Sequence, residues 1–237
     1  MYRYFHRASL ISTAFVALLA ASARAGDAKR DILWSAVRSG DATAIQAALD
    51  SGADVNAKNE IGISALWIAA SNGKPDVIEF LVKHKADVNV RDGIWYMTPL
   101  SMSVGGKKLD ATKFLIKSGA KDVDAALCSA ASMGNEAMVK MILENCKISQ
   151  DALDAALFSA TNAKNAKLQE SLKQAGAKPI PPARPEDRQA WAKLAGTYEA
   201  DGGYTLILTL KDVGLVSGGR WLKPTGPDTF TPLGSEE

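Results

Sequence analysis

The sequence has few of the side chains from which catalytic and metal centres are built. Two cysteines and two histidines occur among 237 residues, and the formal net charge is +2. Two cysteines cannot form a disulfide-dense scaffold or a four-cysteine zinc site, and two histidines exclude most histidine-built metal centres. The near-balanced charge gives no reason to expect a nucleic-acid partner. A content of 47% apolar and 23% charged residues is that of an ordinary globular protein.

The common catalytic motifs are also missing from the chain. No Gly-x-Ser-x-Gly nucleophile elbow occurs, and residues 105–108 lack the spacing and the hydroxyl of a phosphate-binding loop. Two pairs of acids are each close in sequence, and we interpret them as helix caps or first-turn acids. They are Asp122, Asp124, Asp151 and Asp154. We therefore expect no enzyme activity, no cofactor and no metal site.

The first 25 residues have the order of a secretory signal peptide. Arg3 and Arg7 give a basic start, residues 8–23 are uncharged and largely apolar, and residues 23–25 form a small-x-small cleavage pattern. We expect cleavage near Ala25-Gly26 and a periplasmic or secreted protein. The alternative is a signal anchor, although the apolar stretch is short for a spanning helix. No later apolar segment is as long, so no stable membrane insertion is expected after cleavage.

The middle of the chain is built from five internal repeats. Residues 52–56 and 85–89 are near copies, and the same offset separates Leu33 from Leu66. The repeats open at Leu33, Leu66, Leu100, Leu127 and Leu157. At one fixed distance after these leucines come Gly52, Lys85, Gly119, Cys146 and Gly176. The spacing between successive opening leucines varies instead and is shortest in the last two intervals. The helical part therefore has a constant length, and only the connections between repeats vary.

Each repeat is predicted to form two short helices. In the second repeat, Leu66, Ala69 and Ala70 pack the first helix, Gly73 ends it, and Pro75 fits the first turn of the next helix. Small residues recur in the first helices and allow neighbouring repeats to approach closely. One repeat cannot bury its own apolar face, so the stacking of repeats creates the core.

These features resemble the ankyrin repeat over about residues 27–178. The resemblance is carried by Ser64-Ala65-Leu66-Trp67-x-Ala69-Ala70-x-x-Gly73, by Thr98-Pro99-Leu100 and by the Gly-Ala-Asp-Val-Asn ending of the first repeat. It implies a mainly α solenoid of about five helix-turn-helix units with short β-hairpin fingers.

The sequence departs from the family pattern at two positions. The family's histidine after the opening leucine is replaced by Trp34, Trp67, Ser101, Cys128 and Phe158. The helix-ending glycine is Lys107 in the third repeat and Lys164 in the fifth. The last two connections are also too short for full β-hairpins, so shorter fingers are expected there.

The resemblance also implies where a partner binds, since ankyrin proteins use a concave face made of hairpin tips and first helices. The corresponding residues at the tips are Asn59, Glu60, Ile61, Ile63, Asp92, Ile94, Trp95, Tyr96 and Met97. Those on the first helices are Arg38, Ser71, Asn72, Ser132 and Met133. Trp95-Tyr96 is the favoured anchor, because exposed aromatic residues concentrate binding energy. The alternative is that this pair covers the neighbouring finger, and Trp34 and Trp67 are expected in the core.

A second segment follows a proline-rich linker. Residues 179–185 hold four prolines, and residues 205–210 then alternate with Leu206, Leu208 and Leu210 on one face. Glycine-rich turns complete a predicted antiparallel β-meander of four short strands, with further apolar residues on the leucine face. These further residues are Tyr198, Val216, Trp221 and Phe230. Such a sheet needs a covering partner to be stable, and the repeat stack is the nearest candidate.

Residues 196–199 and 222–230 make this segment similar to short β-modules of secreted bacterial proteins. Those modules usually continue with closing strands, whereas this chain stops at Glu237, so the module could be incomplete. The predicted division is a signal peptide (1–25), an ankyrin-repeat domain (26–178), a linker (179–190) and a β-module (191–237). Cys128 and Cys146 start and end one helical hairpin, which is compatible with a disulfide in an oxidising compartment or with two buried thiols.

The sequence therefore predicts non-catalytic protein-protein binding by an exported ankyrin-repeat scaffold. The partner is another protein, for instance an envelope enzyme for which this chain is an accessory, inhibitor or immunity-like partner, and the scaffold is expected to be a monomer. The alternative function is an envelope ligand-binding protein, in which Tyr198, Tyr204 and Trp221 of the β-module contact a glycan or lipid. Binding by the isolated segment 190–237 would favour that alternative.

Overall fold

A computed structural model describes residues 26–93, 96–181, 189, 191–200, 204–211, 214–217, 220–224 and 230–232. The expected signal peptide (1–25), Ile94, Trp95 and most of the proline-rich linker lie outside the described residues. The chain divides into an N-terminal part, Met1–Pro99, and a C-terminal part, Leu100–Glu237. Within the described ranges, every helix is too short or too polar to span a lipid bilayer.

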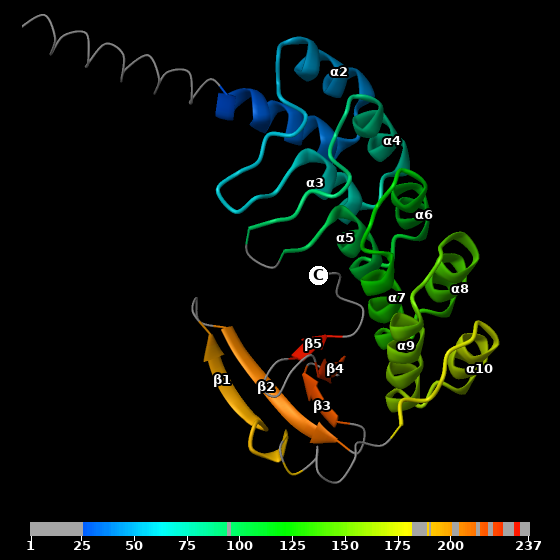
Figure 1. Cartoon of the computed structure of the whole chain (residues 1–237). Coiled ribbons are helices and arrows are strands. Elements are labelled where there is room, and N and C mark those ends of the chain that lie inside the picture. Colours follow the sequence, from blue (N-terminus) through cyan, green and yellow to red (C-terminus); the bar gives the residue numbers. More distant parts are fainter. Residues whose placement is uncertain are drawn as a thin grey trace, which may run out of the picture. The chain divides into compact units, whose positions relative to one another are not determined.

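The described residues of the N-terminal part form two helix pairs and two long loops. A helix over residues 26–39 precedes α2 (Ala42–Asp50), and α3 (Ala65–Asn72) precedes α4 (Pro75–Lys83). The first long loop is residues 51–64, and the second long loop is described over residues 84–93 and 96–98. Both loops extend on the side of the 26–39 helix and α3, away from α2 and α4 (Figure 1).

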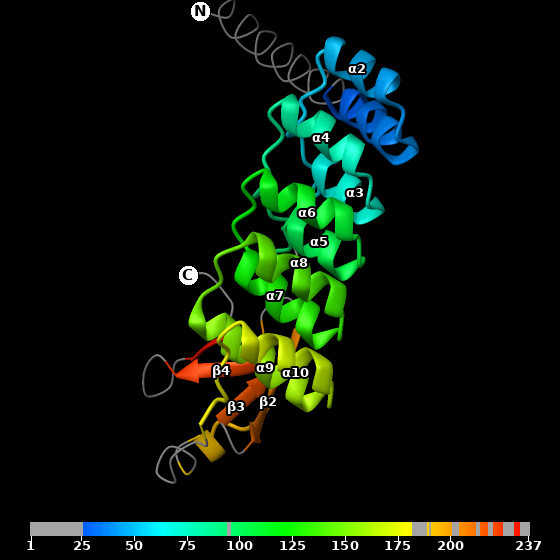
Figure 2. The ribbon, with the colours of Figure 1, turned by 90° about the vertical axis from the view of Figure 1, so that its right-hand side faces the viewer.

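The C-terminal part continues the pattern with three more helix pairs, and the first of these helices begins at the boundary residue Pro99. Their bounds are α5 (Pro99–Gly105), α6 (Leu109–Lys117), α7 (Val123–Ser132), α8 (Glu136–Asn145), α9 (Gln150–Asn162) and α10 (Ala166–Gln174). The pairs follow one another as a stack in Figure 2, with α7 and α9 in one row and α8 and α10 in the other. The connections 118–122 and 146–149 are short, as predicted.

The repeating leucines form the core of each part. Leu33, Leu66, Leu100 and Leu127 are fully buried, and Leu157 is buried as well. At one fixed distance after the opening leucines of the second to fifth repeats, the second helices contribute a large apolar residue that is also fully buried. These residues are Leu81, Leu115, Ile142 and Leu172. The predicted mainly α solenoid of helix-turn-helix repeats, with a small antiparallel β-module, is confirmed.

A left-handed residue ends the first helix of every repeat. At the same place after each opening leucine, the backbone φ is positive, between 53° and 80°. Three of these residues are glycines, which adopt this conformation readily, but the other two are lysines, for which it costs about 1 kcal/mol. In chain order the five residues are Gly40, Gly73, Lys107, Gly134 and Lys164. The lysines thus hold a glycine conformation because the stack requires it.

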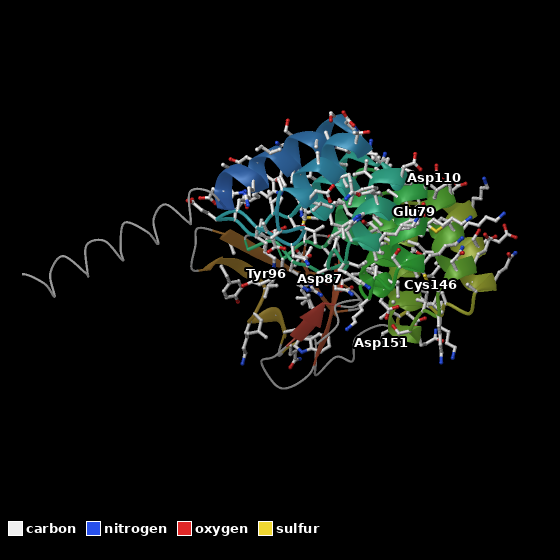
Figure 3. The ribbon with its side chains drawn as sticks, turned by 90° about the horizontal axis from the view of Figure 1, so that it is seen from above. Glu79, Asp87, Tyr96, Asp110, Cys146 and Asp151 are labelled. Atoms are coloured by element: carbon white, nitrogen blue, oxygen red, sulfur yellow. The ribbon has the colours of Figure 1, made fainter. Side chains whose placement is uncertain are left out.

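The two cysteines are not joined by a disulfide. The Cys128 thiol donates to the Ala152 carbonyl oxygen of α9, 3.7 Å away, and packs with Ala152 and Ala155. Cys128 therefore faces the next repeat, whereas Cys146 follows α8 (Figure 3). Burial, with the nearby negative charge of Asp124, raises the pKa of the Cys146 thiol. Of the two alternatives left open by the sequence, the structure thus has two free thiols, of which Cys128 is buried and Cys146 is half-buried.

The acids ahead of the fourth and fifth repeats do more than cap helices. Asp122 is the N-cap residue of α7 but makes no side-chain capping bond. Asp124 accepts a hydrogen bond from the Ser149 backbone N–H (3.1 Å), and Asp154 accepts one from the Lys178 backbone N–H (2.7 Å). Both carboxylates come shortly before an opening leucine, Leu127 or Leu157. They tie each repeat to the segment that follows it, where the connections are too short for loops.

Over the residues that the structure describes, the β-module is an antiparallel meander of five strands, one more than predicted. Its strands pair in chain order: β1 (Gly196–Ala200), β2 (Tyr204–Lys211), β3 (Gly214–Ser217), β4 (Arg220–Pro224) and β5 (Phe230–Pro232). Leu208 and Leu210 pack against a buried pair, Trp191 and Leu222. β4 also contacts α9, and the sheet lies on the side of α9 away from α10 (Figure 1). The expected cover is therefore provided by α9 and by the segment before the sheet.

The register corrects the predicted apolar face. Val216 pairs with Thr209 and with Trp221, whereas Leu208 pairs with Ser217. Val216 and Trp221 thus alternate with the leucines in register instead of joining them, because the pairing of Lys211 with Gly214 fixes the parity of the strands. Tyr198 pairs with Leu206 and does share the leucine register.

The two long loops of the N-terminal part are held together by hydrogen bonds. The Asn56 side chain donates to the Lys85 carbonyl oxygen (3.0 Å) and accepts from the Asp87 N–H (2.8 Å). The Gly93 N–H donates to the Ile61 carbonyl oxygen (2.8 Å). Gly62 lies at this junction with φ +78°, and a Cβ on it would be 2.5 Å from the Gly93 nitrogen. The junction therefore requires glycine for both conformation and space.

We expect Lys107→Gly and Lys164→Gly each to raise the free energy of unfolding by about 0.5 kcal/mol, because glycine removes the left-handed strain but adds chain entropy. Gly134→Ala is the matched reverse change, since its new Cβ would meet nothing closer than 3.8 Å. It should lower the free energy of unfolding by about 1 kcal/mol. Urea unfolding measures all three, and a destabilised Lys107→Gly protein would contradict the strain argument.

We expect Gly62→Ala to lower the free energy of unfolding by more than about 2 kcal/mol, because the methyl group collides with backbone that cannot move independently. Gly52→Ala is the control. Gly52 has φ +88°, but its Cβ would meet only the flexible Lys29 side chain, so about 1 kcal/mol is expected. Equal losses for the two variants, measured by thermal unfolding, would show that the loop junction is not close-packed.

Candidate functional site

A hollow of about 250 Å³ lies in the N-terminal part, between the 26–39 helix, α3 and the first long loop. Five of the residues predicted to bind a partner line it: Arg38, Asn59, Ile63, Ser71 and Asn72. Trp34, Trp67 and Ile68 complete the lining. The site is thus built from two successive first helices and one loop, which are the elements named by the sequence pattern.

The remaining predicted residues lie elsewhere. Glu60 and Ile61 are exposed beyond the hollow, Asp92 is buried and Met97 is half-buried in the second long loop. Ile94 and Trp95, which include half of the favoured anchor, lie outside the described residues. Ser132 and Met133 are exposed at the end of α7 in the C-terminal part. The structure therefore brings together only part of the predicted set.

Trp34 is flanked by two arginines of its own helix. The guanidinium carbon of Arg30 lies 5.2 Å from the Trp34 ring centre, and that of Arg38 lies 5.9 Å from it. The spacing of one helical turn on either side places all three on one helix face. Arg30 also forms ion pairs with Asp27 and Asp31, but Arg38 forms no ion pair with any carboxylate in the part of the chain that the structure describes. Arg38 is therefore the cation that remains available at the hollow.

The first long loop is fixed where it borders the hollow. The Asn59 carboxamide oxygen accepts hydrogen bonds from the Ile63 N–H (2.9 Å) and the Ile61 N–H (3.2 Å). Ser64 then caps α3 by accepting from the Trp67 N–H (3.2 Å). These bonds lead the chain directly from the loop into the helix. Asn59 and Ile63 are consequently held in position before any partner arrives.

The two tryptophans of the lining were expected in the core. Trp34 is 6% exposed, in agreement with that expectation, whereas Trp67 is half-buried. Among the described residues, their indole Nε1 groups are buried donors without a hydrogen-bond acceptor. Sequence reasoning missed that both rings border a hollow. The sequence could have indicated this, because Trp34 and Trp67 directly follow the opening leucines of two successive repeats and therefore occupy equivalent positions.

Tyr96 projects from the second long loop in a strained conformation (Figure 3). Its φ is +53° and its side chain is 69% exposed, and a bulky residue rarely adopts a positive φ. The buried Asp92 carboxylate accepts from the Met97 N–H (3.1 Å), and the Asp92 N–H donates to the Met97 carbonyl oxygen (3.1 Å). These bonds hold Met97 against Asp92, and the neighbouring Tyr96 is exposed.

The strand register separates the three aromatic residues named for the alternative function. Tyr198 and Tyr204 occupy the register of the leucines, but Trp221 occupies the alternate register. The Tyr198 hydroxyl donates to the Leu194 carbonyl oxygen (2.7 Å). Over the described ranges, no three His, Cys, Asp or Glu side chains gather into a metal-binding group.

Comparison with known proteins identifies the repeats. A family model described as ankyrin repeats (3 copies) matches residues 5–92 and 66–154. The chain is 38% identical over 82 residues to serine/threonine-protein kinase 12 of Arabidopsis thaliana, which is 35% of this chain and 18% of the kinase. It is 40% identical over 80 residues to ankyrin repeat and SOCS box protein 6 of Mus musculus, which is 33% of this chain and 19% of that protein.

A third relative is NF-kappa-B inhibitor cactus of Drosophila melanogaster, with 36% identity over 64 residues, 27% of this chain and 13% of cactus. The matched segments span less than a fifth of each of these three relatives. Kinase activity in the first relative is therefore no guide to this chain. The chain belongs to the ankyrin-repeat family, whose repeats act as protein-protein interaction scaffolds.

Proposed function

We propose that this chain is an exported binding protein that holds a partner protein in the hollow and at the loop tips of its N-terminal part. The observation that carries the proposal is the hollow itself, where five residues predicted from the family pattern meet around Trp34 and Trp67. The lining is held by helix packing and loop hydrogen bonds. Little ordering entropy would oppose binding to such a preformed surface.

The second support is the strained and exposed Tyr96. Strain of this kind persists only where the surroundings enforce it, and it is concentrated at functional positions. A rigidly presented tyrosine offers a large contact area with few rotatable bonds. In the C-terminal part, by contrast, β4 contacts α9, so the equivalent side of that helix is covered by the chain's own sheet. The N-terminal part is therefore the better candidate for partner binding.

Export is supported by the amino-acid sequence alone. Residues 1–25 have the order of a signal peptide, although the family model begins to match at residue 5. A periplasmic or secreted scaffold would act on an envelope or secreted enzyme as an accessory, inhibitor or immunity-like partner. Cactus, which is named as an inhibitor, gives a precedent for inhibition by a protein that contains a similar segment.

The test is capture of partners by the tagged protein from the envelope fraction of its own cell, followed by affinity measurement with the purified partner. Arg38→Ala and Tyr96→Ala should each weaken binding by about thirtyfold, the effect expected for a residue at the centre of an interface. Lys83→Ala, at an exposed position of α4, is the surface control and should leave the affinity unchanged. A partner that binds both test variants normally, or the absence of any stoichiometric partner, would contradict the proposal.

A further inference from the structure

We infer that the hollow beside Trp34 and Arg38 recognises a carboxylate next to an apolar side chain, on an extended segment of the partner protein. This inference rests on the proposed function and adds the chemistry of the partner. It follows from three properties of the hollow: its size, the sign of its charge, and the kind of polar group that it leaves unpaired.

The size of the hollow favours a side chain over a metabolite. Pockets for small molecules usually enclose about 300–1,000 Å³, and this hollow encloses about 250 Å³. One or two side chains fill such a volume. Because the hollow lies between two helices and a loop, a chain that runs across it can insert a side chain and continue on either side.

The charge of the hollow is positive. Arg38 is the one ionised group among the eight lining residues, and none of the eight is acidic. The Lys74 ammonium group lies close by, since it donates to the Arg38 carbonyl oxygen (2.7 Å). Arg30 pairs with both Asp27 and Asp31, so this group carries one net negative charge, but none of its three members lines the hollow. Glu60 is exposed on the loop next to Asn59, but it is not part of the lining. A negatively charged ligand therefore complements the hollow.

The buried polar groups left unpaired at the hollow are donors. The indole N–H groups of Trp34 and Trp67 have no acceptor among the described residues. The Asn59 carboxamide oxygen is already used by two backbone N–H groups, so its amide nitrogen is the end that can serve a ligand. A guanidinium group binds a carboxylate with two parallel hydrogen bonds. Since the indole nitrogens are covered and Arg38 is exposed, an acidic ligand meets Arg38 first.

The remaining lining is apolar and accounts for the second half of the recognised motif. Ile63 and Trp67 are half-buried and Ile68 is buried, and all three border the hollow. An aliphatic side chain beside the carboxylate would cover their exposed area. A free carboxylate ion lacks that contact, and a basic segment would be repelled by Arg38.

The experiment is a nuclear magnetic resonance titration that follows the indole N–H signals of ¹⁵N-labelled protein. Trp34→Phe and Trp67→Phe assign the two signals. The probes are three capped peptides, acetyl-Gly-Leu-Asp-Leu-Gly-amide and its Asn and Lys analogues at the central position. We expect the Asp peptide to shift both indole signals saturably, and the Asn peptide to bind about tenfold more weakly because it lacks the charge-assisted bonds.

Arg38→Gln should abolish the preference for the Asp peptide over the Asn peptide, and Arg38→Lys should restore part of it. Lys83→Gln, which removes one positive charge from α4 in the same part of the chain, should leave the preference intact. Three results would overturn the inference: no shift of either indole signal, equal binding of the Asp and Lys peptides, or an undiminished preference in Arg38→Gln. If partner capture still succeeds in that case, the scaffold function stands and only the assigned chemistry is wrong.

Discussion

No helix pair of this chain can bury its own opening leucine, and the rest of the structure depends on the stacking that solves this problem. Leu66, for example, is fully buried at the start of α3, yet α3 is only 8 residues long. A helix of that length has little stability alone. The stack also imposes its geometry on residues that do not favour it, as the left-handed Lys107 and Lys164 show.

The same stacking creates the candidate site. Trp34 and Trp67 occupy the same position in successive repeats, so the packing of one repeat on the next places both rings at one hollow. The long connections then supply what the helices cannot: Asn59 and Ile63 from one loop, and an outward Tyr96 from the other. In the C-terminal part the connections are short, and Asp124 and Asp154 hold successive segments together instead. The loop residues of the candidate site thus come from the long connections.

The sequence predicted the helical frame well, because the opening leucines are the residues that pack in the core. The fixed distance from each leucine to the end of its helical part also marks the length of each helix pair. Five of the residues that it named as partner-binding, Arg38, Asn59, Ile63, Ser71 and Asn72, lie together at the hollow. It placed Val216 and Trp221 on the wrong face of the sheet, because strand register depends on the length of turns that alternation does not reveal. It left open whether Cys128 and Cys146 form a disulfide, because sequence spacing does not say that Cys128 faces α9. The sequence could not predict that Trp34 and Trp67 line a hollow, because this depends on how the first long loop lies against the 26–39 helix and α3.

The central claim is that the binding surface exists before the partner arrives. Amide hydrogen exchange of the isolated protein, followed across residues 26–93, tests it most directly. The account predicts that the backbone N–H groups of the 26–39 helix and of α3 exchange about a thousandfold more slowly than in an unfolded chain, because both helices are packed in the stack. Exchange of these groups at unfolded-chain rates would contradict the account, since the hollow would then form only on binding.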